Sequence, residues 1–180
     1  MKAIVRRATR IAAALCFGLV AGAASASPIL VGQWYTFGFD GSGGDPLISG
    51  AGFITGLRSV DAPDPAWTFN CASACMLTVT DGFIAVDQFE LFDFGASLGN
   101  TSAPSGDSAH TCSNDELACL ADPQMSHGAF MLAAGDHSIT GTHLGGIPGA
   151  AFFIVSVPEP GALLLIGLGL FALFATRRRS

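Results

Sequence analysis

The middle of the chain alternates short apolar stretches with glycine, aspartate and proline, and no stretch of twelve or more residues keeps a clean helical period of 3.6. Short apolar or alternating runs bounded by such turn residues are typical of β-strands. Residues 134–136 (Ala-Gly-Asp) have the composition of a hairpin connection. We expect strands at residues 29–39, 66–70, 76–80, 84–94, 128–132, 137–142 and 150–157.

Seven or eight short strands at this spacing predict an all-β fold, a jelly-roll-like antiparallel β-sandwich. The region between residues 27 and 157 has 131 residues, which is enough to enclose one hydrophobic core. Two segments rich in turn residues, 40–50 and 95–124, are expected to be long loops, and such loops often carry function in compact domains. Within the second loop, residues 112–120 are expected to form one short helical turn.

The N-terminus follows a different pattern. A 13-residue apolar stretch, residues 11–23, is followed by the small residues 24–26 (Ala-Ser-Ala) and preceded by four basic residues, Lys2, Arg6, Arg7 and Arg10. This order predicts a secretory signal peptide over residues 1–26, cleaved before Ser27. A membrane anchor is the alternative, but a spanning helix needs roughly 20 apolar residues.

The C-terminus combines three features in order. The tripeptide Pro158, Glu159, Pro160 is followed by 16 mostly apolar residues, 161–176, and then by the basic cluster Arg177, Arg178, Arg179. Proline keeps the entering chain extended, and the apolar run predicts a single hydrophobic helix of about 24 Å. Because positive residues stay on the cytoplasmic side, the cluster predicts that residues 27–157 lie outside the inner membrane.

This tail, residues 158–180, resembles the PEP-CTERM sorting signal of Gram-negative bacteria. The resemblance implies recognition by an exosortase, a membrane protease-transpeptidase that cleaves near Pro-Glu-Pro. The protein would then be released or attached at the surface of a bacterium that makes extracellular polysaccharide. An ordinary C-terminal anchor is the alternative. Residues 77–81, 87–93, 98–102 and 132–141 also resemble a sandwich domain that often precedes such tails, although Val86 stands where that pattern has a glycine.

Charge narrows the partners of the exported region. Residues 27–157 contain thirteen carboxylates and a single basic residue, Arg58, so the net charge of this region is −12. A surface of that sign repels nucleic acid and anionic lipid headgroups and attracts cations. We therefore expect no nucleic-acid partner, and the general interpretation of the acidity is solubility outside the cell.

Four cysteines lie in the exported region: Cys71, Cys75, Cys112 and Cys119. An even number in an oxidising compartment predicts two disulfides. Three pairings are possible, and we favour Cys71–Cys75 with Cys112–Cys119 because each closes a short loop. A four-thiolate metal site is the alternative, but the spacings of three and six intervening residues do not match a paired C-x₂-C zinc site.

We expect no resident cofactor, with calcium as the alternative. Calcium takes six to eight oxygen ligands in flexible geometry, and carboxylates supply them. The segment from residue 40 to residue 45 lacks the spacing of an EF-hand, and solvated turn aspartates are the default interpretation. The candidate calcium ligands are Asp40, Asp45, Asp81, Asp87 and Asp93.

Aromatic residues suggest a possible sugar platform. Trp67 follows the proline-rich segment 63–66, so it would begin a strand near the end of a loop. Flat rings at such positions stack on sugar faces in carbohydrate-binding sandwiches. Trp67 is therefore the first candidate for an exposed ligand platform, and a place in the core is the alternative.

Catalytic motifs are weak. Residues 95–99 fit the pattern G-x-S-x-G around Ser97, but turn-forming residues follow where a nucleophile elbow needs a helix. None of the four histidines falls in an H-E-x-x-H motif, and His137 and His143 could lie near one another across a strand and its following loop. We interpret the histidines as surface or hairpin residues, and the protein as a non-enzyme.

These patterns favour an exported, exosortase-processed protein of the cell surface or extracellular matrix, with a structural or adhesive role associated with exopolysaccharide. It would be held transiently in the inner membrane by its C-terminal helix. A carbohydrate-binding module, with or without calcium dependence, is the second hypothesis, and a hydrolase is the third.

Overall fold

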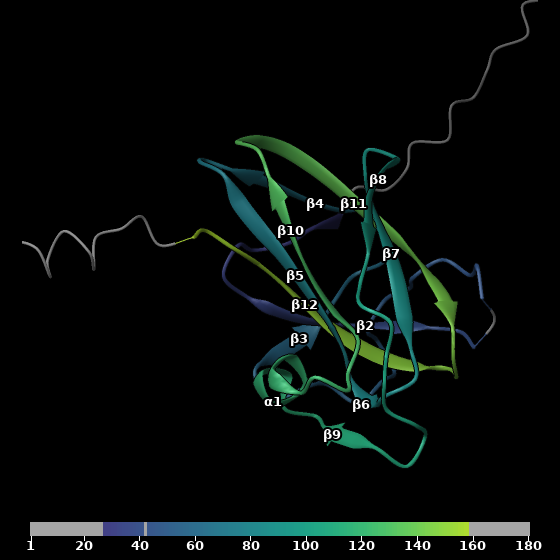
Figure 1. Ribbon diagram of the computed structural model, residues 1–180. Helices are drawn as coiled ribbons and strands as arrows, with labels where there is room; N and C mark the ends of the chain where they lie inside the picture. Colours follow the sequence, from purple (N-terminus) through teal and green to yellow (C-terminus); the bar gives the residue numbers. More distant parts are fainter. Residues whose placement is uncertain (1–26, 42, 159–180) are drawn as a thin grey trace, which may run out of the picture.

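The computed structural model describes residues 27–41 and 43–158. Two five-stranded sheets contain most of the strands (Figure 1). In spatial order, the first sheet holds β1 (Ser27–Pro28), β4 (Trp67–Cys71), β11 (Gly135–Gly145), β7 (Gln88–Asp93) and β8 (Ala96–Asn100). The second holds β10 (His127–Leu132), β5 (Cys75–Asp81), β12 (Gly149–Ser156), β2 (Trp34–Phe39) and β3 (Ser59–Asp61). Strands β6 (Phe83–Ile84) and β9 (Thr111–Ser113) form a two-stranded sheet, and α1 (Glu116–Ala121) is the helix of the described residues.

The hydrophobic core lies between the two five-stranded sheets. In β4 the buried residues alternate with more exposed ones, as a strand with one face on a core requires. Trp67 of β4 stacks on Phe153 of β12 in the opposite sheet, with ring centroids 4.3 Å apart. Phe37 of β2 packs against the same two rings, so aromatic side chains join the layers at their centre.

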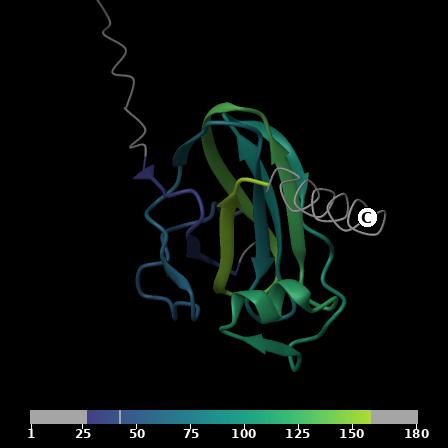
Figure 2. The ribbon, with the colours of Figure 1, turned by 90° about the vertical axis from the view of Figure 1, so that its left-hand side faces the viewer.

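β12 is buried on both faces, which explains its continuous apolar sequence. One face of β12, including Phe153 and Val155, joins the main core between the sheets. On the other face Phe152 packs with Trp34 and Cys119, under the segment that carries α1. Figures 1 and 2 both show α1, with β9 beside it, at one end of the sheets.

The mostly-β class predicted from the sequence is confirmed, and the seven expected strand regions all contain strands. The long loop expected at residues 95–124 was wrong in part, because it contains β8 and β9. The helix α1 agrees with the short helical turn expected at residues 112–120. The expected strand at 84–94 is interrupted: β6 ends at Ile84 and β7 begins at Gln88. The signal peptide predicted at residues 1–26 lies outside the described residues, as does most of the tail predicted at 158–180.

The hairpin predicted at residues 134–136 is wrong. β10 pairs with β5, whereas β11 pairs with β4 and β7 in the other sheet. The segment between β10 and β11 therefore crosses from one layer to the other. An alternating pattern identifies a strand and its inward face, but it does not say which strand becomes the neighbour.

Candidate functional site

A groove of about 570 Å³ lies on the first sheet, where β1, β4 and β11 meet the turn after β7. Its apolar lining includes Ile29, Phe69 and Phe94, and its polar lining includes Thr68, Asp136 and Ser138. Thr68 and Ser138 are directly opposite each other in the β4–β11 pairing. The groove therefore combines an apolar wall with hydroxyl and carboxylate groups.

Phe94 is the exposed feature of this groove. It lies in the turn between β7 and β8, and 70% of its surface is accessible to solvent. Its φ angle of 47° is in the left-handed region, which residues other than glycine seldom adopt and bulky residues least of all. The Phe94 backbone N–H donates to Ser138 O at 3.0 Å, which fixes the turn against β11.

A buried histidine, His137, lines the groove and pairs with the carboxylate of Asp93. His137 Nδ1 lies 2.8 Å from Asp93 Oδ2, and the other oxygen of Asp93 accepts from the Ser138 backbone N–H at 3.0 Å. His137 Nε2 lies 3.0 Å from Ala133 O. Burial lowers the pKa of His137, but the hydrogen bonds to Asp93 and Ala133 and the negative charge of Asp93 outweigh it and raise the pKa above its usual 6.5.

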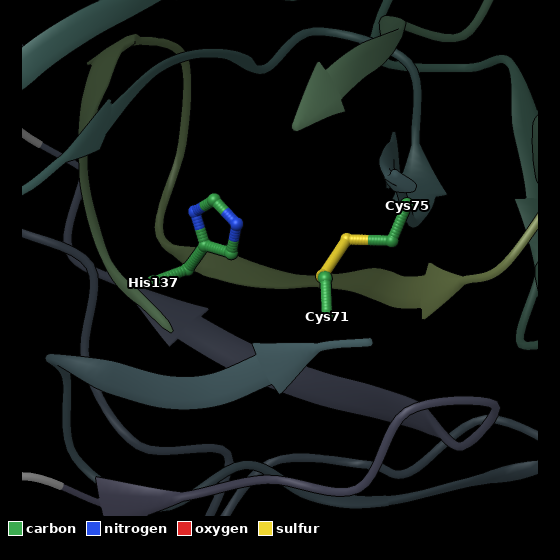
Figure 3. A group of neighbouring side chains, drawn as sticks. All are labelled: Cys71, Cys75 and His137. Carbon is green, nitrogen blue, oxygen red and sulfur yellow. A yellow bond between two sulfur atoms is a disulfide. The ribbon is translucent and has the colours of Figure 1, made fainter. Parts of the chain in front are cut away.

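The same histidine lies beside a disulfide (Figure 3). Cys71 and Cys75 are bonded to each other, and their sulfurs lie within 4.8 Å of an imidazole nitrogen of His137. Among the residues that the structure describes, these three form the group with the geometry to hold a metal ion. Thiolates bind metals, whereas these sulfurs are engaged in a disulfide, so the group as it stands is a structural cross-link.

A second polar cluster lies at the other end of β11. Asp81 ends β5, and its two carboxylate oxygens accept from the backbone N–H groups of Gly82 and Asp87, at 2.8 and 3.2 Å. Asp87 in turn accepts through Oδ1 from His143 Nε2 at 2.8 Å and from the Ile147 backbone N–H at 3.0 Å. The two aspartates thus hold the loop between β5 and β7 and tie it to β11.

Burial controls the charge of this cluster. The pKa of Asp81 is raised to about 8. Burial is the larger cause, and the negative charge of Asp87 adds to it. Burial also raises the pKa of Asp87, although its hydrogen bonds from His143 and Ile147 oppose the rise. Asp81 is therefore largely protonated at neutral pH, which limits the negative charge that the loop must hold.

Asp87 also borders an apolar pocket of about 180 Å³. Phe83 lines this pocket in a left-handed conformation, with a φ angle of 64°. The other side chains around it include Phe53, Ile54, Ile84, Ile147 and Pro148. The walls offer few polar groups, so the pocket suits an apolar group better than a hydrated one.

The described structure ends shortly after β12, at Val157 and Pro158, which are both exposed. Residues 156–179 match the family model of the PEP-CTERM protein-sorting motif. The chain carries a PEP-CTERM sorting signal. This motif implies export, processing by an exosortase (a membrane enzyme) and localisation at the surface. No curated protein and no solved structure matches the chain.

Only the first residues of the sorting motif fall within the described part of the chain. Pro158 is exposed and lies two residues after the end of β12, so the Pro-Glu-Pro tripeptide begins outside the folded sheets. Glu159, Pro160 and the arginines 177–179 lie outside the described residues. Within the described ranges, the structure contains no helix that is long and apolar enough to cross a membrane.

Trp67 is not an exposed platform, so this prediction is wrong. Only 1% of its surface is accessible, and its indole N–H donates to Pro63 O at 2.8 Å. Trp67 begins β4 as expected, but its position in the alternating pattern points the ring into the core. Within residues 27–41 and 43–158 the exposed aromatic residue is Phe94, and the signal for it was a phenylalanine directly before a glycine in the turn after β7.

The calcium candidates do not converge as one group. Asp81 and Asp87 meet through the loop after β5, whereas Asp93 pairs with His137 at the other end of β11. Asp40 is exposed and Asp45 half-buried in the loop that follows β2. Calcium binding by these carboxylates stays the alternative to the expectation of no cofactor.

The histidines differ from the surface residues that we expected. His137 and His143 are 7% and 0% exposed, and each pairs with a different aspartate. They lie six residues apart on the same strand, which separates them by about 20 Å, so they are not neighbours. Ser97, the residue of the G-x-S-x-G pattern, donates to Glu90 Oε1 at 2.7 Å on the exposed edge strand β8.

The disulfides agree with the favoured pairing, Cys71–Cys75 and Cys112–Cys119. Sequence reasoning missed the role of Arg58 beside the second disulfide. Its guanidinium lies 2.7 Å from Asp115 Oδ1 and 3.5 Å from Glu116 Oε2, and its backbone N–H donates to Glu116 Oε1 at 2.8 Å. Asp115 caps α1 by accepting from the first-turn N–H groups, so Arg58 ties the helix to the loop before β3.

Proposed function

We propose that this PEP-CTERM protein is a non-enzymatic component of the cell surface or extracellular matrix, with a structural or adhesive role associated with exopolysaccharide. The observation that carries this proposal is the sorting motif at residues 156–179, which begins at the last residue of the last strand of a β-rich domain. Two disulfides and a net charge of −12 over residues 27–157 suit a domain that works in an oxidising, aqueous environment.

The route to that location follows from the two ends. Residues 1–26 direct export, and the apolar residues 161–176 anchor the chain in the inner membrane until the exosortase acts. The arginines at 177–179 keep the C-terminal end in the cytoplasm, because positive residues resist transfer across the membrane.

Processing can be tested in the native host, with and without its exosortase. We expect the unaltered protein to yield a shorter product, lacking the tail, only when the exosortase is present. Replacing Pro158 and Glu159 with alanine should leave the full-length chain in the membrane fraction. The exposed Asp40→Ala is the matched control and should be processed normally. Equal processing without any exosortase would contradict the proposal.

We also infer that the sandwich is of the jelly-roll type. The strand order supports this when the eight longer strands are counted along the chain: β2, β4, β5, β7, β8, β10, β11 and β12. One sheet then holds the second, seventh, fourth and fifth strands, and the other the sixth, third, eighth and first. Successive strands alternate between layers except for one hairpin, as two interleaved Greek keys require.

A carbohydrate-binding module is the second candidate function. It is favoured by the groove on the first sheet, where Phe94 is exposed beside Asp136 and Ser138. Exposed rings beside hydroxyl and carboxylate groups are the elements of sugar recognition. The test is a pull-down with the host's own exopolysaccharide, in calcium and in chelator. Retention lost in chelator would support calcium dependence, and no retention in either condition would contradict this function.

A further inference from the structure

Phe94 stands apart from the other aromatic residues. It is the one aromatic side chain in the exposed class among the described residues, whereas most of the others contribute to the cores. Contact between a large apolar ring and water is unfavourable in free energy, and the left-handed backbone at Phe94 adds conformational strain. Glycine would satisfy the same turn without either cost, so the ring is better explained by a ligand than by the fold.

The groove holds polar groups within reach of that ring. The hydroxyls of Thr68 and Ser138 make no side-chain hydrogen bond to other described residues, and Asp136 is exposed. The Asn70 side-chain amide donates to Asp136 Oδ1 at 2.7 Å, which orients this carboxylate. Two hydroxyls and an oriented carboxylate can serve donors and acceptors of a polar ligand.

The support under the groove is rigid. Asp93 accepts from His137 and from the Ser138 N–H, while the Phe94 N–H donates to Ser138 O. These bonds hold the turn after β7 against β11, so the ring and the polar groups keep a fixed relative position. Preorganised sites lose less conformational entropy when a ligand binds.

We propose that this groove binds a neutral pyranose unit of a polysaccharide, with an apolar sugar face stacked on Phe94 and sugar hydroxyls bonded to Asp136 and Ser138. The inference rests on the second candidate function and names its site. The volume of about 570 Å³ falls within the range of small-ligand sites.

The charges in the groove select against acidic sugars. No basic residue lines it except His137, which is buried and directs both ring nitrogens to protein oxygens. A uronic acid would place its carboxylate beside Asp136, in a domain that carries a net charge of −12. Two neighbouring carboxylates repel each other, so the groove should prefer a neutral sugar over a uronate.

Native-gel affinity electrophoresis of the full chain tests this site. The chain is solubilised in a polyoxyethylene detergent, which carries no sugar, and run through gels containing dextran, hydroxyethyl cellulose, the neutral fraction of the host's exopolysaccharide, or alginate. We expect retardation by at least one neutral polysaccharide and none by alginate. Phe94→Gly, which suits the left-handed backbone, should weaken binding about tenfold or more.

Further variants distinguish a specific loss of binding at the groove from a general effect of substitution on the fold. Phe94→Trp should retain binding because it keeps a platform, and Asp136→Asn should weaken it. Met131→Ala is the matched control, since Met131 is 63% exposed on β10 of the other sheet, and it should bind normally. Unchanged binding by Phe94→Gly, or retardation by alginate alone, would overturn the groove but not carbohydrate binding. No retardation of the unaltered chain by any of the polysaccharides would overturn both.

Discussion

His143 Nε2 lies 2.8 Å from Asp87 Oδ1, and both side chains are withdrawn from solvent, with 0% and 3% of their surface exposed. The pair joins β11 to the loop before β7. Asp87 also accepts from the Ile147 N–H, so a single carboxylate contacts both β11 and the connection that leads from β11 to β12.

Removing this carboxylate should therefore destabilise the fold. Asp87→Ala leaves the buried His143 and the partly buried Ile147 N–H without their acceptor, and we expect a loss of about 3 kcal/mol in the free energy of unfolding. Asp87→Asn keeps one acceptor oxygen and should cost less, about 1 kcal/mol. Urea unfolding with the disulfides intact measures both. The exposed Asp40→Ala should change stability by less than about 0.5 kcal/mol, and an equally small effect of Asp87→Ala would contradict the prediction.

The contact between Asp87 and His143 could not be predicted from the sequence. Asp87 and His143 are 56 residues apart, and no local pattern records that they meet. The strands were predictable because alternation is a local property, and the disulfides because short loops close easily. Trp67 was misjudged as a platform because one sequence does not separate a ring that faces the core from one that faces solvent. Phe94 escaped notice because its exposure depends on the turn geometry after β7.

The pH dependence of stability offers a second prediction. The pKa of Asp81 is 3.8 in the unfolded chain and about 8 in the folded protein. Between these values the folded protein keeps a proton that the unfolded chain has released, so the free energy of unfolding should fall as pH rises, by about 1 kcal/mol per pH unit. The raised pKa of His137 acts in the same direction above pH 6.5, where its stabilising proton is lost. Stability should thus decrease from pH 5 to pH 8.

Asp81→Asn tests this assignment. Asparagine does not ionise, so urea unfolding at pH 5, 6, 7 and 8 should show a shallower fall than in the unaltered protein. Asn also loses one of the two backbone acceptors, and a uniform offset in stability is expected at every pH. Asp40→Asn, at an exposed position, is the matched control and should keep the original slope. An unchanged slope in Asp81→Asn would assign the pH dependence to other groups.

Arg58 supports a third prediction. Glu116 is fully buried at the start of α1, and Arg58 supplies the cation beside its Oε2. Arg58→Ala removes that cation and should cost about 1–2 kcal/mol, a figure that allows for the 45% exposure of the arginine. The double variant Arg58→Ala/Glu116→Gln should lose less than the sum of the single changes, because a neutral amide needs no counter-ion. Strict additivity in urea unfolding would show that the two side chains are not coupled.

The two disulfides should differ in accessibility more than in their effect on stability. They join residues four and seven positions apart, and the chain-entropy relation assigns about 2 kcal/mol to loops of either length. Replacing each pair with serine should cost roughly that amount. Reduction of the folded protein should be selective, however, because Cys71 and Cys75 are both buried whereas Cys112 is half-buried. Under mild dithiothreitol followed by alkylation, mass spectrometry should find Cys112 labelled first. Labelling of Cys71 or Cys75 at an equal rate would mean that the region around the disulfide between β4 and β5 opens as readily as the segment that carries α1.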